Sequence, residues 1–373
     1  MSVPGGEREF AAPTRIIAGR GCASTRLGVE LGALAADTVA LVADRGFAEA
    51  GLLAPLLAGI DDVAVPICAL IGEDPDVAET EAAALSALAH GATAVLAIGG
   101  GSAMCAAKGV AIRLRNPAPL DAYEGSGRLP VPPAPSIAIP TTAGSGSEVS
   151  NVVVLHDPGR ERHLVIRGHG YEPRVALLDG ELLRSLPRAP MIAAALDALS
   201  HALEACWARR TTRFSDAMAL AAAAAIRAAL PRALAGEVDA MQELIEASAM
   251  ANLACGNAGL GLVHALSSAP DVHLPHGYQN GVLLPHVAAF NRSRVAVAAA
   301  AEIDELDALY ATIAFAASFA PGELSAHDAE LMVAAAMSNP FRANNLREAD
   351  AAELHAILLA AGATPASRSQ PAA

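Results

Sequence analysis

The stretch AVLAIGGGSAMCAAK, residues 94–108, decides the fold of this chain. It opens with an apolar run typical of a buried strand, continues with three glycines and a serine, and ends in residues that favour a helix. A strand that turns through glycines into a helix is the unit of doubly wound α/β proteins, and the turn sets backbone N–H groups where phosphates bind. Since neither phosphate-loop pattern GxGxxG nor GxxxxGK(S/T) is matched, a tight turn without a ligand stays open as the alternative.

Four further apolar runs lie on either side of this stretch at the spacing of βαβ units: TVALVAD (38–44), DVAVPICAL (62–70), APSIAIPTTAG (134–144) and RVALLDG (174–180). Continuous Val, Ile, Leu and Ala runs are typical of strands buried on both faces. We therefore predict a largely parallel sheet with helices on both sides. Between these runs, NVVVLHD and RHLVIRG, separated by PGRE, predict a β-hairpin.

Beyond Pro187 the pattern changes to long segments rich in Ala and Leu at helical spacing, such as MIAAALDALSHALEACWA (191–208). This change predicts two domains. We expect an α/β domain over residues 1–186 and an all-α domain over residues 187–362, followed by a tail without fixed structure over residues 363–373.

The composition excludes several classes of protein. With 373 residues, 53% hydrophobic and 17% charged, the chain can build a large core and is not intrinsically disordered. Its net charge of −14, without a basic cluster, argues against nucleic acid and anionic membranes as partners. Two long uncharged stretches, 129–147 and 247–270, are interrupted by Pro or by Asn and Gly, so neither is expected to cross a membrane. Five cysteines without a CxxC pair argue against a disulfide framework and favour the cytoplasm.

A second loop rich in Gly, Ser and Thr, TTAGSGSE (141–148), also follows an apolar strand. Two such loops at neighbouring strand ends would form a polar crevice, and enclosed hydroxyl groups need hydrogen-bond partners. A diphosphate ligand would supply these partners. The alternative is a solvated connection.

A carboxylate and several histidines in the second half could bind a metal ion. Asp197 and His201 are four residues apart in an apolar helical segment, so they project from one face, and His264, His273 and His276 follow in the next apolar segments. A lone histidine is more often a core or surface residue than a ligand. One carboxylate with three imidazoles, however, suits Fe²⁺ or Zn²⁺, and the absence of a thiolate set argues against a structural zinc site.

Six segments, in order along the chain, resemble the iron-containing (group III) alcohol dehydrogenases, which share a fold with dehydroquinate synthase and glycerol dehydrogenase. These segments are GGGSAMCAAK (99–108), IPTTAGSGSEVSNVVVLHD (139–157), RVALLDGELLRSLP (174–187), ALDALSHALEA (195–205), GLGLVHAL (259–266) and PHGYQNGVLLPHV (275–287). The resemblance implies an N-terminal α/β dinucleotide-binding domain and an all-α C-terminal domain in a dehydroquinate synthase-like fold. The metal and the active site would lie in the cleft between the two domains.

The resemblance also implies roles for individual residues. The implied metal ligands are Asp197, His201, His264 and His276, and the implied cofactor contacts are Gly100, Gly101, Ser102, Thr141, Thr142 and Ser145. Asp44, at the end of TVALVAD, matches the acidic position that family members use on the adenosine ribose. A carboxylate there predicts NAD rather than NADP, because it would repel a 2′-phosphate, whereas the neighbouring Arg45 could accommodate one.

Three residues depart from the family pattern. Cys105 replaces an Asp, His163 replaces a Lys that follows the hairpin turn and contacts the cofactor, and Ser268 stands four residues after His264, where relatives usually have a second histidine. Without that imidazole the proton needs another route, and His273 is the nearest candidate in the sequence because an imidazole suits a relay at neutral pH. Transfer through water and a ribose hydroxyl group is the alternative, with Ser268 shaping the substrate site.

The resemblance implies a metal-dependent, NAD-linked oxidoreductase that interconverts a small primary alcohol and its aldehyde, and a homodimer or larger homo-oligomer. Maleylacetate reductase is a less favoured alternative, because those reductases tend to lack the metal ligands that are intact here. The three departures also allow a homologue that binds cofactor and metal without dehydrogenase turnover, or one with a non-redox activity.

Overall fold

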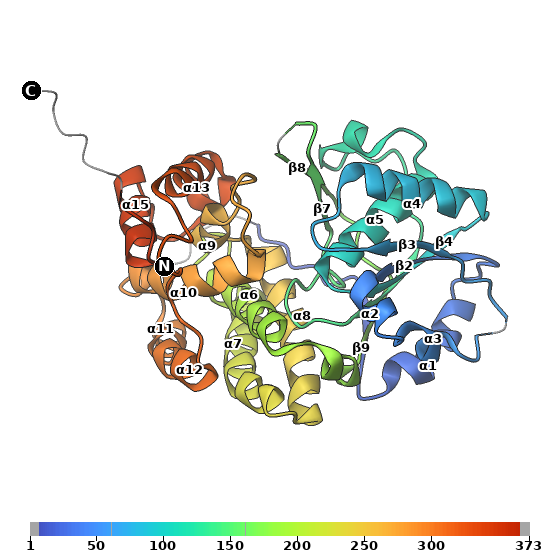
Figure 1. Cartoon of the computed structure of the whole chain (residues 1–373), viewed down its shortest axis with the longest axis horizontal. Coiled ribbons are helices and arrows are strands. Elements are labelled where there is room, and N and C mark those ends of the chain that lie inside the picture. The colour runs from blue at the N-terminus through green and yellow to red at the C-terminus, as the bar shows by residue number, and fades with distance from the viewer. Residues whose placement is uncertain (1–6, 61, 161, 366–373) are drawn as a thin grey trace, which may run out of the picture.

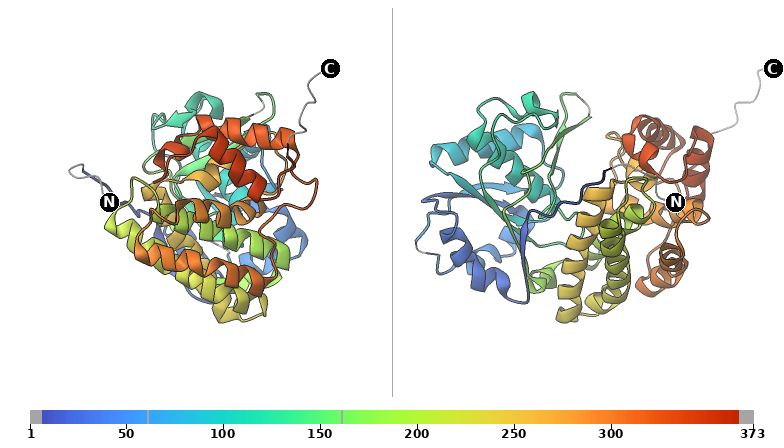
Figure 2. Two further views of the ribbon diagram at one scale, coloured as in Figure 1. Left: turned by 90° about the vertical axis from the view of Figure 1, so that its left-hand side faces the viewer. Right: turned by 180° about the vertical axis from the view of Figure 1, so that it is seen from behind.

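The computed structural model describes residues 7–365 except 61 and 161, and places an α/β half beside a helical half (Figures 1 and 2). The predicted parallel sheet is confirmed: six strands run parallel in the order β1-β9-β6-β4-β2-β3. They are β1 (Arg15–Ala18), β2 (Val39–Asp44), β3 (Ile67–Ile71), β4 (Ala94–Gly99), β6 (Ser136–Pro140) and β9 (Val175–Leu178). The sequence did not indicate β1, since four residues are too few to show a period.

Helices cover both faces of this sheet, as predicted. They are α1 (Cys22–Gly32), α2 (Arg45–Glu49), α3 (Leu53–Leu57), α4 (Val77–Ala89) and α5 (Gly101–Arg115), with short 3₁₀ turns at Leu120–Tyr123 and Gly180–Ser185. Alternate residues of each strand point to opposite faces. Leu41 and Leu96 pack with α1 on one face, whereas Val42 and Val95 pack with alanines of α4 and α5 on the other.

The predicted hairpin is confirmed as part of a separate small sheet in the order β5-β8-β7. Its strands are β5 (Gly125–Ser126), β7 (Val152–Asp157) and β8 (Arg162–Arg167), and β7 and β8 are antiparallel. Leu155 and Leu164 face a core that also contains Ile112 of α5 and Cys105 at its edge, so the replacement at Cys105 packs within this half. No pattern in the sequence indicated β5, which has only two residues.

The second half is helical, as predicted. Among the described residues beyond β9, it consists of α6 (Arg188–Cys206), α7 (Arg213–Leu234), α8 (Val238–Ala258), α9 (Leu262–Leu266), α10 (His276–Asn291), α11 (Val297–Asp304), α12 (Leu306–Ile313), α13 (Ala326–Ser338), α14 (Pro340–Asn344) and α15 (Ala351–Ala360). By length and composition alone α7 could cross a membrane. It packs against α6 and α8, however, and its Ala222, Ile226 and Leu230 are buried, so one face of α7 belongs to the core of this half. Most of the predicted disordered tail, residues 366–373, lies outside the described residues.

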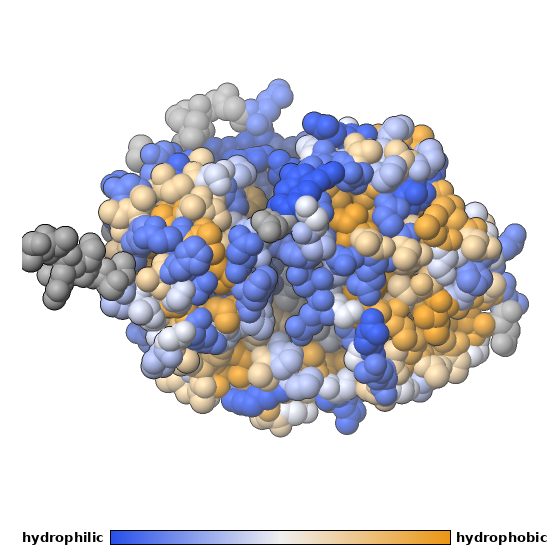
Figure 3. Space-filling view, turned by 45° about the horizontal axis from the view of Figure 1, so that its top comes forward, coloured by the Kyte–Doolittle hydropathy of each residue, from blue (hydrophilic) through white to orange (hydrophobic). Residues whose placement is uncertain are grey.

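The carboxyl edge of the parallel sheet faces the helical half. The loop after β6 reaches that half, since Gly144 lies against Ala194 of α6 and Gly146 against Asn252 of α8. Figure 3 shows hydrophilic residues gathered along the groove between the halves. The loop after β6, one of the two predicted cofactor loops, therefore meets α6, which carries the predicted ligands Asp197 and His201.

Candidate metal centre and cofactor groove

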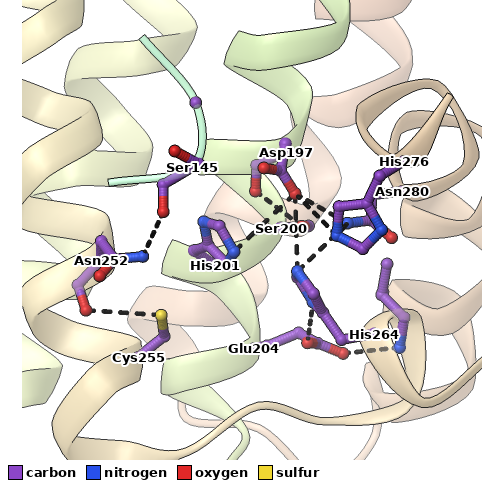
Figure 4. Close-up of polar contacts among 12 residues, drawn as sticks. Ser145, Asp197, Ser200, His201, Glu204, Asn252, Cys255, His264, His276 and Asn280 are labelled. Atoms are coloured by element: carbon purple, nitrogen blue, oxygen red, sulfur yellow. Dashed lines mark hydrogen bonds and ion pairs between the residues drawn. The ribbon is translucent and has the colours of Figure 1, made fainter. Parts of the chain in front are cut away.

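One carboxylate and three imidazoles come together in the helical half (Figure 4). Asp197 and His201 project one turn apart from α6, which is apolar on its other faces, His264 comes from α9, and His276 begins α10. Oδ1 of Asp197 is the centre of the cluster. The Nε2 atoms of His264, His201 and His276 lie 3.5, 3.8 and 3.9 Å from it, respectively. These separations are long for direct hydrogen bonds and suit donors that share one cation.

Burial differs among the four groups. The backbone and side chains of Asp197, His201 and His264 are buried, and their donor atoms all lie within 4.8 Å of one another. The side chain of His276 is 55% exposed. The cluster is therefore closed toward the helices and open toward the groove, as a metal site with room for a substrate requires.

Glu204, which the sequence analysis did not single out, fixes the orientation of His264. Its carboxylate is fully buried and accepts hydrogen bonds from His264 Nδ1 at 2.7 Å, from the backbone N–H of Val263 at 2.6 Å and from that of Gly261 at 3.0 Å. A carboxylate that holds the second ring nitrogen sets the tautomer of a ligand histidine and makes it more basic. Because Glu204 lies seven residues after Asp197, helical spacing places it on the same face of α6 and is the signal that could have found it.

The electrostatics of the cluster favour a cation. Burial opposes ionisation of Asp197, but the facing imidazoles outweigh it and hold the pKa of its carboxyl well below the usual range. Burial lowers the pKa of His201 to about 4, so this ring is neutral and ready to bind a metal. Burial also disfavours charge on His264, yet the carboxylates of Asp197 and Glu204 raise its pKa to about 9. A proton there balances two buried carboxylates, and a bound metal ion would take its place.

Unpaired polar atoms show that the residues fit a metal ion. Nδ1 of His201 and Oδ1 of Asn280 are buried without a hydrogen-bond partner. The amide Nδ2 of Asn280 donates to Asp197 Oδ1 at 2.7 Å and lies 3.1 and 3.0 Å from the Nε2 atoms of His264 and His276. When His264 is in the neutral form that binds a metal, the two hydrogens of this amide cannot serve three acceptors, so one lone pair of the cluster is left without a hydrogen bond. A divalent cation with imidazole and carboxylate ligands, Fe²⁺ or Zn²⁺, matches this deficit.

The two predicted cofactor loops lie in contact. A Cβ atom on Gly101 would be 2.9 Å from Ser145 Cβ, and one on Gly100 would be 3.2 Å from Thr142 Oγ1, so the glycines are required by the close approach of the loops. Gly100 caps α5, whose first turn includes Ser102. The loops thus present free backbone N–H groups and hydroxyl groups at the N-terminus of a fifteen-residue helix, which is a suitable environment for a phosphate group.

The loop after β6 connects this environment to the metal cluster. Gly146 has a φ of +58° and lies so close to α8 that a Cβ would overlap the side chain of Asn252. Asn252 Nδ2 donates to the carbonyl oxygen of Ser145 at 2.6 Å, and Figure 4 shows both residues beside His201. Thr141, by contrast, is buried and its backbone N–H bonds Gly99 O, which continues the pairing of β6 with β4.

Asp44 ends β2 at the carboxyl edge of the sheet and caps α2, because its Oδ1 accepts a hydrogen bond from the backbone N–H of Phe47 at 2.8 Å. The guanidinium of Arg45 turns away to bond Leu70 O at 2.9 Å and lies 3.7 Å from Glu79. The guanidinium of Arg45, the cation next to Asp44, therefore already has partners in Leu70 O and Glu79.

The residues predicted to replace the missing histidine differ in their surroundings. Ser268 Oγ donates to Ala265 O at 2.7 Å and accepts from Asn339 Nδ2 at 3.0 Å, so its one proton is already used. His273 is exposed in the loop that leads to His276. His163, on β8, lies within electrostatic reach of His276, which places the end of the hairpin toward the metal cluster.

Both halves of the chain match known families. Residues 13–180 match the family described as iron-containing alcohol dehydrogenase, and residues 191–362 match the C-terminal region of the Fe-containing alcohol dehydrogenase family. The chain is 34% identical over 291 residues to the probable alcohol dehydrogenase EutG of Escherichia coli, covering 76% of this chain and 73% of that protein. It is 33% identical over 288 residues to the NAD-dependent methanol dehydrogenase of Bacillus methanolicus, covering 76% and 75%.

A solved structure supports the same fold. Sulfoacetaldehyde reductase from Bifidobacterium kashiwanohense, in complex with NAD⁺, aligns with a TM-score of 0.88 at 27% identity over 96% of this chain and 99% of that chain.

Proposed function

The chain belongs to the iron-containing alcohol dehydrogenase family, and from that premise we propose how its residues carry out the reaction. The protein is a metal-dependent, NAD-linked oxidoreductase that interconverts an alcohol and its aldehyde by hydride transfer. We take the substrate to be a small primary alcohol. The observation that supports this most is the cluster around Asp197, which opens toward the groove that the cofactor loops border.

Asp197, His201, His264 and His276 are the proposed ligands of Fe²⁺ or Zn²⁺. When bound, the metal supplies Lewis-acid polarisation of a substrate oxygen and the nicotinamide supplies or accepts a hydride. The protein's own side chains position the metal ligands. Glu204 orients His264, and Asn280 has an amide that can present either its nitrogen or its oxygen to the cluster.

The proposed cofactor contacts are Gly100, Gly101, Ser102, Thr141, Thr142 and Ser145 for the diphosphate side, His163 on the facing hairpin and Asp44 for the adenosine ribose. NAD is preferred over NADP because Asp44 carries a negative charge where a 2′-phosphate would lie. The engagement of Arg45 by Leu70 and Glu79 supports this preference, since its guanidinium is held away from that position.

Proton transfer is proposed to run through His273 or through solvent, and not through Ser268. The hydroxyl proton of Ser268 is committed to Ala265 O, so a relay through it would first break that hydrogen bond. An exposed imidazole in the loop just before α10 exchanges protons with water and can serve a group in the groove.

The setting of the enzyme is also a proposal. Its free cysteines favour the cytoplasm, and its net negative charge argues against nucleic acid or a membrane as partner. The oligomeric state usual in the family favours a homodimer or larger homo-oligomer. The domain boundaries at 186 and 362 are proposed as well, and the end of the turn Gly180–Ser185 before α6 and the end of α15 at Ala360 support them.

The test is metal-reconstituted enzyme assayed for aldehyde-dependent oxidation of NADH across a panel of short aldehydes, with maleylacetate included as the competing substrate. We expect turnover with a short aldehyde, and loss of both metal and turnover in His276→Ala. Bound metal without turnover on any aldehyde or alcohol would show that the chain is a binding homologue. Turnover on maleylacetate alone would support the reductase alternative.

A further inference from the structure

A second group of metal-binding side chains lies outside the cluster described above, on the α/β half of the groove. It consists of Asp74, His156 and His163. We propose that these three residues form a separate site for a divalent transition-metal ion of the zinc class. This site goes beyond the proposed dehydrogenase function, and an ion bound there would stand between His163 and the cofactor that this residue is proposed to contact.

The hairpin brings the two histidines together. In the antiparallel register of β7 and β8, His156 lies directly opposite His163. Leu155 and Leu164, their neighbours, point into the core, so the two imidazoles stand on the other face. Their ring centroids are 5.9 Å apart with planes at 72°, which is an edge-on arrangement and leaves the ring nitrogens free to converge.

The carboxylate is delivered by the loop between β3 and α4, which is attached to the hairpin. The backbone N–H of His156 donates to Pro75 O at 3.0 Å, and Asp76 forms a parallel bridge with His156. Asp74 precedes this attachment and its Oδ2 lies 3.7 Å from Nδ1 of His156. The three side chains therefore come from two segments that the backbone holds side by side.

The donor atoms of these three side chains have the spacing of metal ligands, and the hydrogen bonds that could account for their arrangement without a metal are missing at His156 Nδ1. One donor atom from each of the three side chains lies within 4.8 Å of the other two. Ligands at about 2.1 Å from a tetrahedral zinc ion lie about 3.4 Å from one another, so small side-chain rotations suffice. Nδ1 of His156 is buried without a hydrogen-bond partner, and 3.7 Å is too long for a bond to Asp74. A cation between these two atoms would satisfy both.

The donor types select the metal. Two imidazoles and one carboxylate favour Zn²⁺, Fe²⁺, Ni²⁺ or Cu²⁺ over Mg²⁺ and Ca²⁺, which take oxygen ligands. Burial lowers the pKa of His163, so this imidazole is neutral at neutral pH, as a ligand must be. The side chain of Asp74 is 65% exposed. Three protein ligands with an exposed carboxylate leave a coordination position for water or for a ligand in the groove.

The hairpin that carries His156 and His163 stands on the edge of the α/β half that faces the helical half, where the first cluster lies (Figure 1). An ion here would add positive charge beside the cofactor and substrate. It would also hold the β3–α4 loop to the hairpin.

The test is zinc stoichiometry of the full chain after removal of metal by a chelator, measured by calorimetric titration and by metal analysis after desalting. We expect two equivalents in the unaltered protein. His163→Lys, which keeps a cation at this position but removes the imidazole, should bind one equivalent, and His276→Ala should also bind one, at the second site. The control His169→Ala, at an exposed histidine on the loop after β8, should keep both.

Two equivalents in His163→Lys, or a single equivalent in the unaltered protein that His163→Lys keeps, would overturn the second site. A single equivalent that His163→Lys loses and His276→Ala keeps would overturn the first site and support the second, so the failures of the two assignments can be told apart. Circular dichroism checks that each variant is folded. If His163→Lys does not fold, His156→Ala asks the same question, and retention of both equivalents there would equally overturn the proposal.

Discussion

Replacing Glu204 by Gln should weaken metal binding while the protein stays folded. The Glu204 carboxylate accepts three hydrogen bonds, from His264 Nδ1 and from the N–H groups of Gly261 and Val263, all in a fully buried position. A glutamine of the same shape has one oxygen acceptor, so its amide NH₂ must face at least one of these donors. The negative charge that orients and polarises the His264 ring is also lost.

The magnitude follows from these contacts. Leaving one buried donor without a partner costs about 1–3 kcal/mol of folding free energy. Loss of a carboxylate behind a ligand histidine weakens metal affinity by roughly 10- to 100-fold, which is about 1.4–2.7 kcal/mol of binding free energy. Glu204→Ala removes all three acceptors and should destabilise the protein by more, about 3–5 kcal/mol.

The assay is the dissociation constant for Zn²⁺ or Fe²⁺ from competition with a chelator, with urea unfolding of the metal-free protein measured in parallel. Glu243→Gln is the matched control, because Glu243 pairs with Arg232 on the surface and should change neither quantity. An affinity in Glu204→Gln equal to that of the unaltered protein would refute the role of Glu204. So would an equal loss in the control.

Four further outcomes are expected. Gly146→Ala should lower the free energy of unfolding in urea by about 3 kcal/mol or more, because the new Cβ would overlap Asn252. The control Gly127→Ala, at a similar φ of +66° but in open space, should lower it by about 1–2 kcal/mol. Equal losses in the two variants would contradict the close packing at Gly146. Asp44→Asn keeps an oxygen to cap α2 but removes the charge, so the ratio of kcat/KM for NAD to that for NADP should fall about tenfold, and an unchanged ratio would exclude Asp44. In His273→Ala the pH–rate profile should lose an ionisation between about pH 6 and 8, with turnover reduced about 100-fold; an unchanged profile would assign the proton to solvent. Burial raises the pKa of Glu148 to about 7 from 4.5, so the folded state binds this proton more tightly and stability falls as the pH rises through that interval. Glu148→Gln should remove about 3 kcal/mol of that fall in urea unfolding at pH 5 and pH 8, and an equal fall in both proteins would show that Glu148 is not its source.

The sequence by itself determined five of the six strands of the parallel sheet, the hairpin and most of the candidate ligands, whereas β1 and β5 were too short to be indicated. Strands buried on both faces must be apolar throughout, so runs such as AVLAI identified the parallel sheet, and the glycines after it identified the turn into α5. Asp197 and His201 share a helix, where a separation of four residues fixes their relative position whatever the rest of the chain does. Local periodicity carries this information because it does not depend on distant contacts.

Only the tertiary structure decided the contacts between segments far apart in the sequence. Glu204 meets His264 because α6 and α9 pack together, across 60 residues, and Asn280 reaches Asp197 across 83. The group of Asp74, His156 and His163 depends on the register of the hairpin and on one hydrogen bond between His156 and Pro75. No sequence period encodes such pairings, because they are set by how whole helices and strands pack against one another, and a shift of one residue in β8 would move His163 to the opposite face.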